Sequence, residues 1–68
     1  MTRKEMITIC VEDQIRRGYV KPENKNRHIR LRLIGSGLIK PMKKAECQKW
    51  YDEVMEGVQD EVQDSSDT

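Results

Sequence analysis

The order of secondary-structure elements depends on residues 28–42, which read HIRLRLIGSGLIKPM. Apolar and polar side chains alternate strictly over 28–33. The apolar positions are Ile29, Leu31 and Leu33, and the polar positions are His28, Arg30 and Arg32. Alternation is typical of a half-buried strand, because successive side chains of a strand point to opposite faces of the sheet. Residues 28–34 are therefore predicted to form a β-strand.

Residues 35–37, Gly-Ser-Gly, predict a tight reversal of the chain after this strand. Glycine adopts the positive φ angles that hairpin turns require. The run at 38–42 then supplies a second strand, and Pro41 places it at the sheet edge or ends it, because proline lacks the N–H that a ladder needs. A phosphate-binding loop is not expected, since Leu38 and Ile39 follow the glycines in place of a lysine and a helix.

The segment before the hairpin predicts an amphipathic helix from Arg3 to Arg17. Thr2 and Glu5 have the spacing of a capping box, in which each side chain accepts a hydrogen bond from the other residue's backbone N–H. Apolar residues then recur at helical spacing, and Gly18 can close the helix. A strand over 7–11 is the alternative, because several of those residues are β-branched.

The segment after the hairpin predicts a second amphipathic helix, from Lys43 to Val58 or at most to Val62. Its apolar residues recur every three or four positions, and its charged residues occupy the positions between them. Trp50 is the largest of the apolar residues and is expected at the centre of the core.

These elements predict a small α+β domain in the order α-β-β-α, with both helices packed on one face of a short antiparallel hairpin. The domain is expected to span 1–62. Residues 63–68 are acidic and polar and are expected to form a disordered tail. A homodimer would add buried area to so small a core, and it remains open beside the monomer.

The charged residues are separated along the chain. The chain has 68 residues, 37% of them charged, and a net charge of +1. Residues 1–44 hold twelve Lys/Arg and four acids, which gives +8, whereas residues 45–68 hold one Lys and eight acids, which gives −7. This separation predicts an interaction surface, or else neutralisation of one part by the other within the chain or between two copies.

The sequence offers little for catalysis. His28 is the only histidine, and Cys10 and Cys47 lie far apart, without the Cys/His spacing of a zinc site. Both cysteines are expected to be buried core residues, with a disulfide or a reactive thiol as the alternatives. No catalytic, cofactor-binding or metal-binding residue is predicted, and we expect no enzyme activity.

Two candidate binding surfaces follow from the predicted fold. The basic one lies on and around the hairpin and comprises Lys25, Arg27, His28, Arg30, Arg32 and Lys40. The acidic one lies on the last helix and comprises Asp52, Glu53, Glu56, Asp60 and Glu61. Separated charge of this kind suits electrostatically steered association with a protein partner.

We therefore expect a small, non-enzymatic protein-binding module that modulates a partner protein. Its size and composition resemble those of proteins that phages and other mobile elements direct at host factors. The alternative is a nucleic-acid-binding module that neutralises phosphates with the basic hairpin face. A cytoplasmic location without membrane association is expected, because the sequence has neither a signal-peptide pattern nor an apolar run of about 18 residues.

Overall fold

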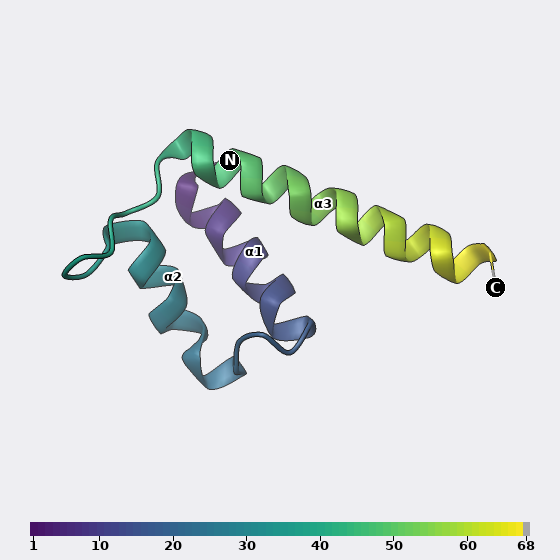
Figure 1. Cartoon of the computed structure of the whole chain (residues 1–68), viewed down its shortest axis with the longest axis horizontal. Coiled ribbons are helices and arrows are strands. Elements are labelled where there is room, and N and C mark those ends of the chain that lie inside the picture. Colours follow the sequence, from purple (N-terminus) through teal and green to yellow (C-terminus); the bar gives the residue numbers. More distant parts are fainter. Residues whose placement is uncertain (68) are drawn as a thin grey trace.

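The described part of the chain folds into three α-helices and one short 3-10 helix. The computed structural model describes the backbone of residues 1–67 and the side chains of residues 1–57. The elements are α1 (Arg3–Arg16), η1 (Pro22–Asn24), α2 (Lys25–Ile34) and α3 (Lys44–Asp67). α1 packs against both α2 and α3 and lies between them (Figure 1).

The predicted α-β-β-α fold is wrong, because the described part of the chain contains no sheet. Residues 28–34 are helical and belong to α2. Ile29 and Leu33 are four residues apart, so they share one face of a helix as well as one face of a strand. Arginine and leucine, which fill most of this stretch, are strong helix formers, and this preference outweighs the alternation. Among the described residues, strand pairing is limited to one isolated antiparallel bridge between Ser36 and Ile39.

The first predicted helix is confirmed, together with its capping box. The hydroxyl of Thr2 accepts a hydrogen bond from the backbone N–H of Glu5 at 3.1 Å, and Glu5 Oε1 accepts one from the N–H of Thr2 at 3.0 Å. The hydrogen bond that the backbone N–H of Thr2 donates to this carboxylate lowers the pKa of Glu5, and the side chain of Thr2 adds to the effect. The helix ends at Arg16, and Gly18 follows with a φ of 84°. The alternative strand over 7–11 is not formed.

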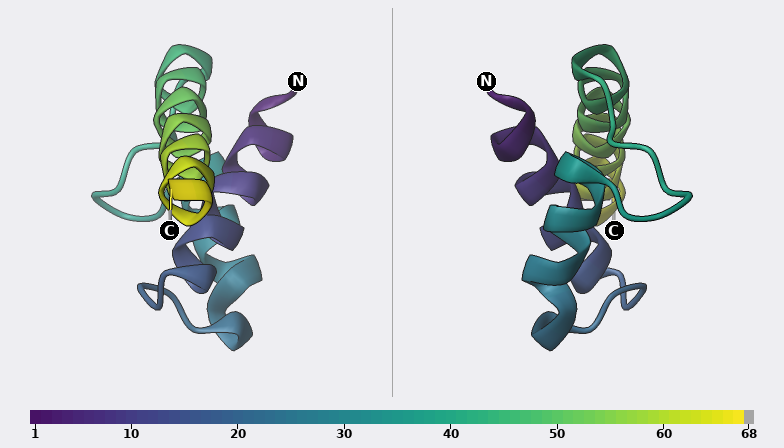
Figure 2. Two further views of the ribbon diagram at one scale, coloured as in Figure 1. Left: turned by 90° about the vertical axis from the view of Figure 1, so that its right-hand side faces the viewer. Right: turned by 90° about the vertical axis from the view of Figure 1, so that its left-hand side faces the viewer.

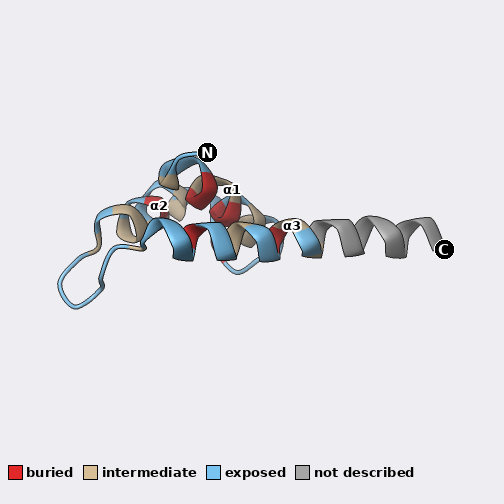
Figure 3. Cartoon of the chain, turned by 90° about the horizontal axis from the view of Figure 1, so that it is seen from above, coloured by how far each residue is buried: buried red, intermediate tan, exposed pale blue. Residues whose placement is uncertain are grey.

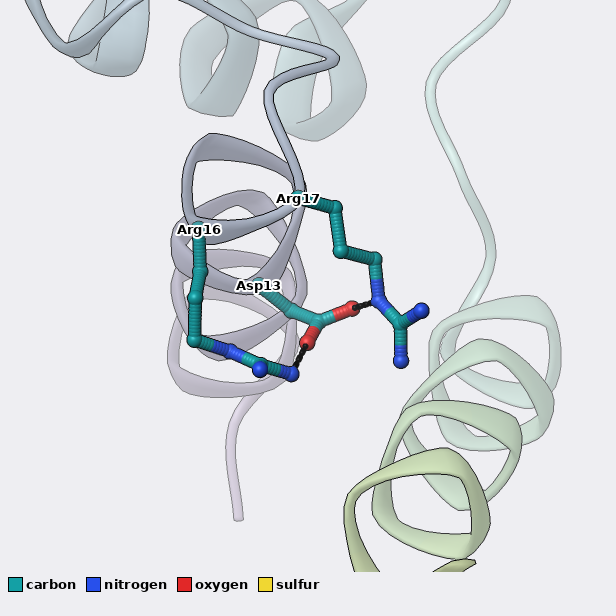
Figure 4. Close-up of polar contacts among 3 residues, drawn as sticks. All are labelled: Asp13, Arg16 and Arg17. Carbon is teal, nitrogen blue, oxygen red and sulfur yellow. Dashed lines mark hydrogen bonds and ion pairs between the residues drawn. The ribbon is translucent and has the colours of Figure 1, made fainter. Parts of the chain in front are cut away.

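The C-terminal turn of α1 is held by a carboxylate that bridges two arginines (Figure 4). Arg16 Nη2 lies 2.6 Å from Asp13 Oδ1, and Arg17 Nε lies 2.9 Å from Asp13 Oδ2. Burial alone would raise the pKa of Asp13, but the hydrogen bonds and positive charges of the two arginines lower it overall.

The core is small and centred on α1. Five side chains are fully buried: Met6, Ile7, Cys10, Val11 and Cys47. Ile29 from α2 and Val54 from α3 are also buried, so one face of each outer helix closes on α1 (Figure 3). Trp50 is only partly buried and packs against the edge of this cluster, so its predicted central position is wrong. The two cysteines are buried free thiols, as expected.

The last predicted helix is confirmed as α3. The N–H of Lys43 donates to Glu46 Oε1 at 3.0 Å and so caps the first turn. α3 continues to Asp67 and so extends past the predicted end at Val58 or Val62. The side chains of 63–68 lie outside the described residues, so the expected disordered tail and the domain boundary at residue 62 stay predictions.

Candidate functional site

The helix at Lys25–Ile34 divides the predicted basic surface, because alternating residues of a helix do not share a face. Arg27 and Arg30 are one turn apart on the outer side of α2, and both are exposed. Lys40 is exposed in the segment that follows. These three residues remain available on the surface, and the other three are used within the fold or partly covered.

Lys25 and Arg32 both face other helices. Lys25 Nζ lies 2.9 Å from Glu12 Oε2, which joins α2 to α1. The guanidinium of Arg32 stacks over Trp50 of α3, and its Nη1 lies 3.8 Å from the sulfur of Met42. Arg32 Nε is buried without a hydrogen-bond partner among the described residues. His28 is half-buried. The predicted basic surface therefore reduces to Arg27, Arg30 and Lys40.

The predicted acidic surface lies on α3. Asp52, Glu53 and Glu56 are exposed there, and Gln48 Nε2 donates to Asp52 Oδ1 at 2.9 Å. The side chains of Asp60 and Glu61 lie outside the described residues, so their part of the prediction stays open. The exposed acids lie on α3, whereas Arg27 and Arg30 lie on α2. α1 lies between these two helices and separates them (Figure 1).

A short turn after α2 projects from the three helices (Figures 1 and 2). The N–H of Ser36 donates to the carbonyl of Ile39 at 2.9 Å, and the N–H of Ile39 donates to the carbonyl of Ser36 at 2.8 Å. Gly37 has a φ of 54° and occupies the first central position, as in a type II′ turn. Leu38 occupies the second position and is fully exposed, at 102% of its reference area.

The base of this turn is held at both ends. Arg3 Nη1 donates to the carbonyls of Leu33 at 3.3 Å and Met42 at 2.6 Å. The N–H of Met42 donates to the carbonyl of Arg32 at 2.8 Å, so the chain returns to α2 before α3 begins. The turn is therefore fixed to the body by its own hydrogen bonds and by those at its base.

Gly35 allows the chain to leave α2 and enter the turn. Its φ of 73° and ψ of −176° lie in a region that is essentially restricted to glycine. A Cβ atom there would meet the carbonyl oxygen of Ile39 and lie 2.9 Å from Pro41 Cδ. The close packing of Gly35 on the returning chain thus fixes the direction in which the turn projects.

The segment that runs from α2 into the turn carries both exposed cations and exposed apolar residues. We call this region the α2–turn surface. It comprises Arg27, Arg30, Ile34, Leu38, Ile39 and Lys40. Ile34 is 62% exposed and Ile39 is 55% exposed, so with Leu38 they form three exposed large apolar side chains within six residues. Exposed apolar residues with charged residues near them in the chain are candidates for an interaction site.

A cleft of about 420 Å³ lies within this region. Leu31 and Ile34 supply the apolar part of its lining. Arg27 and Arg30 line the cleft along α2, and Gly35 and Ser36 line its end beside the turn. No carboxylate lines the cleft among the described side chains. Its electrostatic potential is therefore set mainly by the two guanidinium groups.

Sequence reasoning identified the cations of the α2–turn surface but missed its apolar residues. Ile34, Leu38 and Ile39 were assigned to strands of a sheet and not to an exposed turn. The signal was present in the Gly-Ser-Gly at 35–37, which predicted a tight reversal and so placed the following residues next to its tip.

The two buried cysteine thiols both have raised pKa values. Burial, with smaller effects from Asp13 and Cys47, raises the pKa of Cys10 to about 11. Burial also raises the pKa of Cys47. Within the described part of the chain, no group of three or more His, Cys, Asp or Glu side chains is arranged to hold a metal ion.

Comparison with known proteins gives no relative. The chain matches no protein-family model, no curated protein and no solved structure. Among the described residues, none of the helices combines the length and the apolar character needed to cross a membrane.

Proposed function

We propose that the chain is a non-enzymatic protein-binding module that contacts its partner through the α2–turn surface. The observation that carries this proposal is Leu38, whose side chain is fully exposed on a turn fixed by two backbone hydrogen bonds. A large apolar side chain held in water stabilises nothing within the chain. In a complex, it would bury its surface without first losing the freedom of a mobile loop.

The charge of the surface defines the partner further. Arg27 and Arg30 line the cleft together with Ile34, and the exposed Lys40 follows Ile39 in the chain, so an acidic protein surface would complement these cations. Arginine is also enriched at protein interfaces. We therefore propose a partner that presents carboxylates around an apolar patch.

Crosslinking tests this proposal directly. Leu38 is replaced by a photoreactive benzoylphenylalanine, and the matched control carries the same residue at the exposed position of Lys4 on α1. We expect discrete protein adducts from position 38 that disappear in Arg27→Glu/Arg30→Glu, and no such adducts from position 4. Equal adducts from both positions, or none from position 38, would contradict the proposal.

Nucleic-acid binding is the alternative, supported by the exposed pair Arg27 and Arg30. It predicts a mobility shift that weakens with salt, with the salt slope falling by about one for each of Arg27→Ala and Arg30→Ala. The proposed function predicts no such shift. The inward position of Arg32 weakens this alternative, because that residue was to share the phosphate-binding face.

A cytosolic location, a homodimer and an origin in a phage or mobile element also stay predictions. The free thiols of Cys10 and Cys47 support a reducing compartment. Sedimentation at several concentrations tests the homodimer.

A further inference from the structure

The cleft beside the turn has the features of a binding site for a short segment of chain. It follows the outer side of α2 from Asn26 in the first turn of the helix to Ser36 beyond its end. At 1.5 Å of rise per residue, the helical part of this span is about 12 Å long. An extended peptide covers about 3.3 Å per residue, so roughly four residues would fill that length.

The lining of the cleft selects the chemistry of that segment. Leu31 and Ile34 form an apolar lining that would bury one large apolar side chain. Arg27 and Arg30 line the same cleft, and no described carboxylate neutralises them there. Guanidinium groups bind carboxylates in paired hydrogen bonds, which favours aspartate or glutamate next to the apolar residue.

Nucleic acid fits this lining less well. Its phosphates would meet the arginines, but its bases bind single-stranded sites by stacking on aromatic rings. The described lining of the cleft includes no aromatic side chain. The apolar lining is therefore better suited to a large apolar side chain of a peptide than to a nucleic-acid base.

From these features we infer that the cleft between α2 and the turn binds a short acidic segment of a partner protein. One large apolar side chain of the segment enters between Leu31 and Ile34, and flanking carboxylates bind Arg27 and Arg30. This inference rests on the proposed function and specifies the partner's contact. Leu38, at the tip of the adjoining turn, then packs against the partner outside the cleft.

A displayed library of random peptides tests the inference with the purified protein as bait. We expect enriched peptides that combine Asp or Glu with a large apolar residue. They should bind wild-type protein about tenfold or more tightly than Arg27→Glu/Arg30→Glu. Ile34→Ser should also weaken binding, because Ile34 is 62% exposed and its replacement leaves the core intact.

The matched control is Lys4→Glu/Lys49→Glu, which changes the net charge equally at two exposed positions outside the cleft. Unchanged peptide binding by this variant supports the inference, and circular dichroism confirms that each variant folds. Enrichment of peptides without acidic residues, equal binding to the Arg27→Glu/Arg30→Glu bait, or no enrichment over that bait would overturn it. Protein crosslinks from position 38 without any selected peptide would overturn the peptide site and leave the proposed function standing.

Discussion

The guanidinium carbon of Arg32 lies 4.3 Å from the centroid of the Trp50 ring, which joins α2 to α3 across the edge of the core. This contact explains why Arg32 belongs to the fold and not to the binding surface. It also places a tryptophan, the only one in the chain, where its fluorescence reports on the packing of the two outer helices.

A double-mutant cycle on this pair should give a measurable coupling energy. Arg32→Ala and Trp50→Leu each remove the cation–π contact, and we expect a coupling of about 0.5–2 kcal/mol in the free energy of unfolding. Urea unfolding followed by circular dichroism measures all four proteins. Strictly additive effects would show that the stacked arrangement contributes nothing to stability.

Met6→Ala should strongly destabilise the chain. Met6 is fully buried between the helices, and truncation of a buried methionine costs about 2–5 kcal/mol. A domain of this length has a stability of roughly 3–10 kcal/mol, so much of it would be lost. Leu38→Ala is the control and should change stability by less than about 0.5 kcal/mol. Comparable losses in both variants would contradict the assignment of core and surface.

The glycines of the turn should differ in their tolerance of alanine. Gly35 and Gly37 both have positive φ, and either substitution meets a backbone cost of about 1–3 kcal/mol for that conformation. An alanine Cβ at Gly35 also collides with the carbonyl of Ile39, whereas at Gly37 it meets open space. Gly35→Ala should therefore be the more destabilising in urea unfolding and should shift the amide resonances of 36–39. Equal costs would argue against close packing at Gly35.

Acid should weaken the fold through Asp13. Its pKa is lower in the folded chain than the ordinary value of 3.8, so the native state releases the proton more readily than the unfolded state. The resulting stability is present above pH 3.8 and is lost as the pH falls through the lower, folded pKa. Asp13→Asn should be less stable at neutral pH and should show a smaller change over the acid range. Thermal unfolding at several pH values measures the stability of both proteins. An equal loss of stability in acid for the two would show that Asp13 is not its cause.

The cysteines should react slowly in the folded chain. The pKa of Cys10 rises to about 11, mainly through burial, and its thiolate is therefore scarce at neutral pH. Reaction with an aromatic disulfide should accelerate as urea unfolds the chain. Because the thiol's ordinary pKa is 9.0, its contribution to stability is present below pH 9.0 and is lost as the pH rises towards about 11. Fast reaction without denaturant would contradict the burial of both thiols.

The sequence predicted α1 and α3 but not α2, and the reason is physical. α1 and α3 carry apolar residues at three- and four-residue spacing, and the cap at Thr2 and Glu5 marks one boundary. In α2, the apolar residues that share the inner face are Ile29 and Leu33, a spacing of four that fits both periods. Contact with α1 and the helix preference of arginine and leucine decide between them.

Only part of the candidate site could be predicted from the sequence, because the site also depends on where α2 begins and ends. Arg27, Arg30 and Lys40 are exposed as expected, because long cations seldom lie in a core. Ile34, Leu38 and Ile39 were assigned to a sheet that does not form, so their exposure was missed. Their position depends on where α2 ends and how Gly35 redirects the chain, which hydropathy does not encode.

The central position of α1 has a consequence for biosynthesis. Met6 and Ile7 leave the ribosome before α3, which is one of the two helices that cover them. The growing chain must carry these side chains uncovered until Cys47 and Val54 have emerged. Nascent chains stalled before residue 47 should therefore be digested readily by protease, and protection should begin only once α3 is free to close.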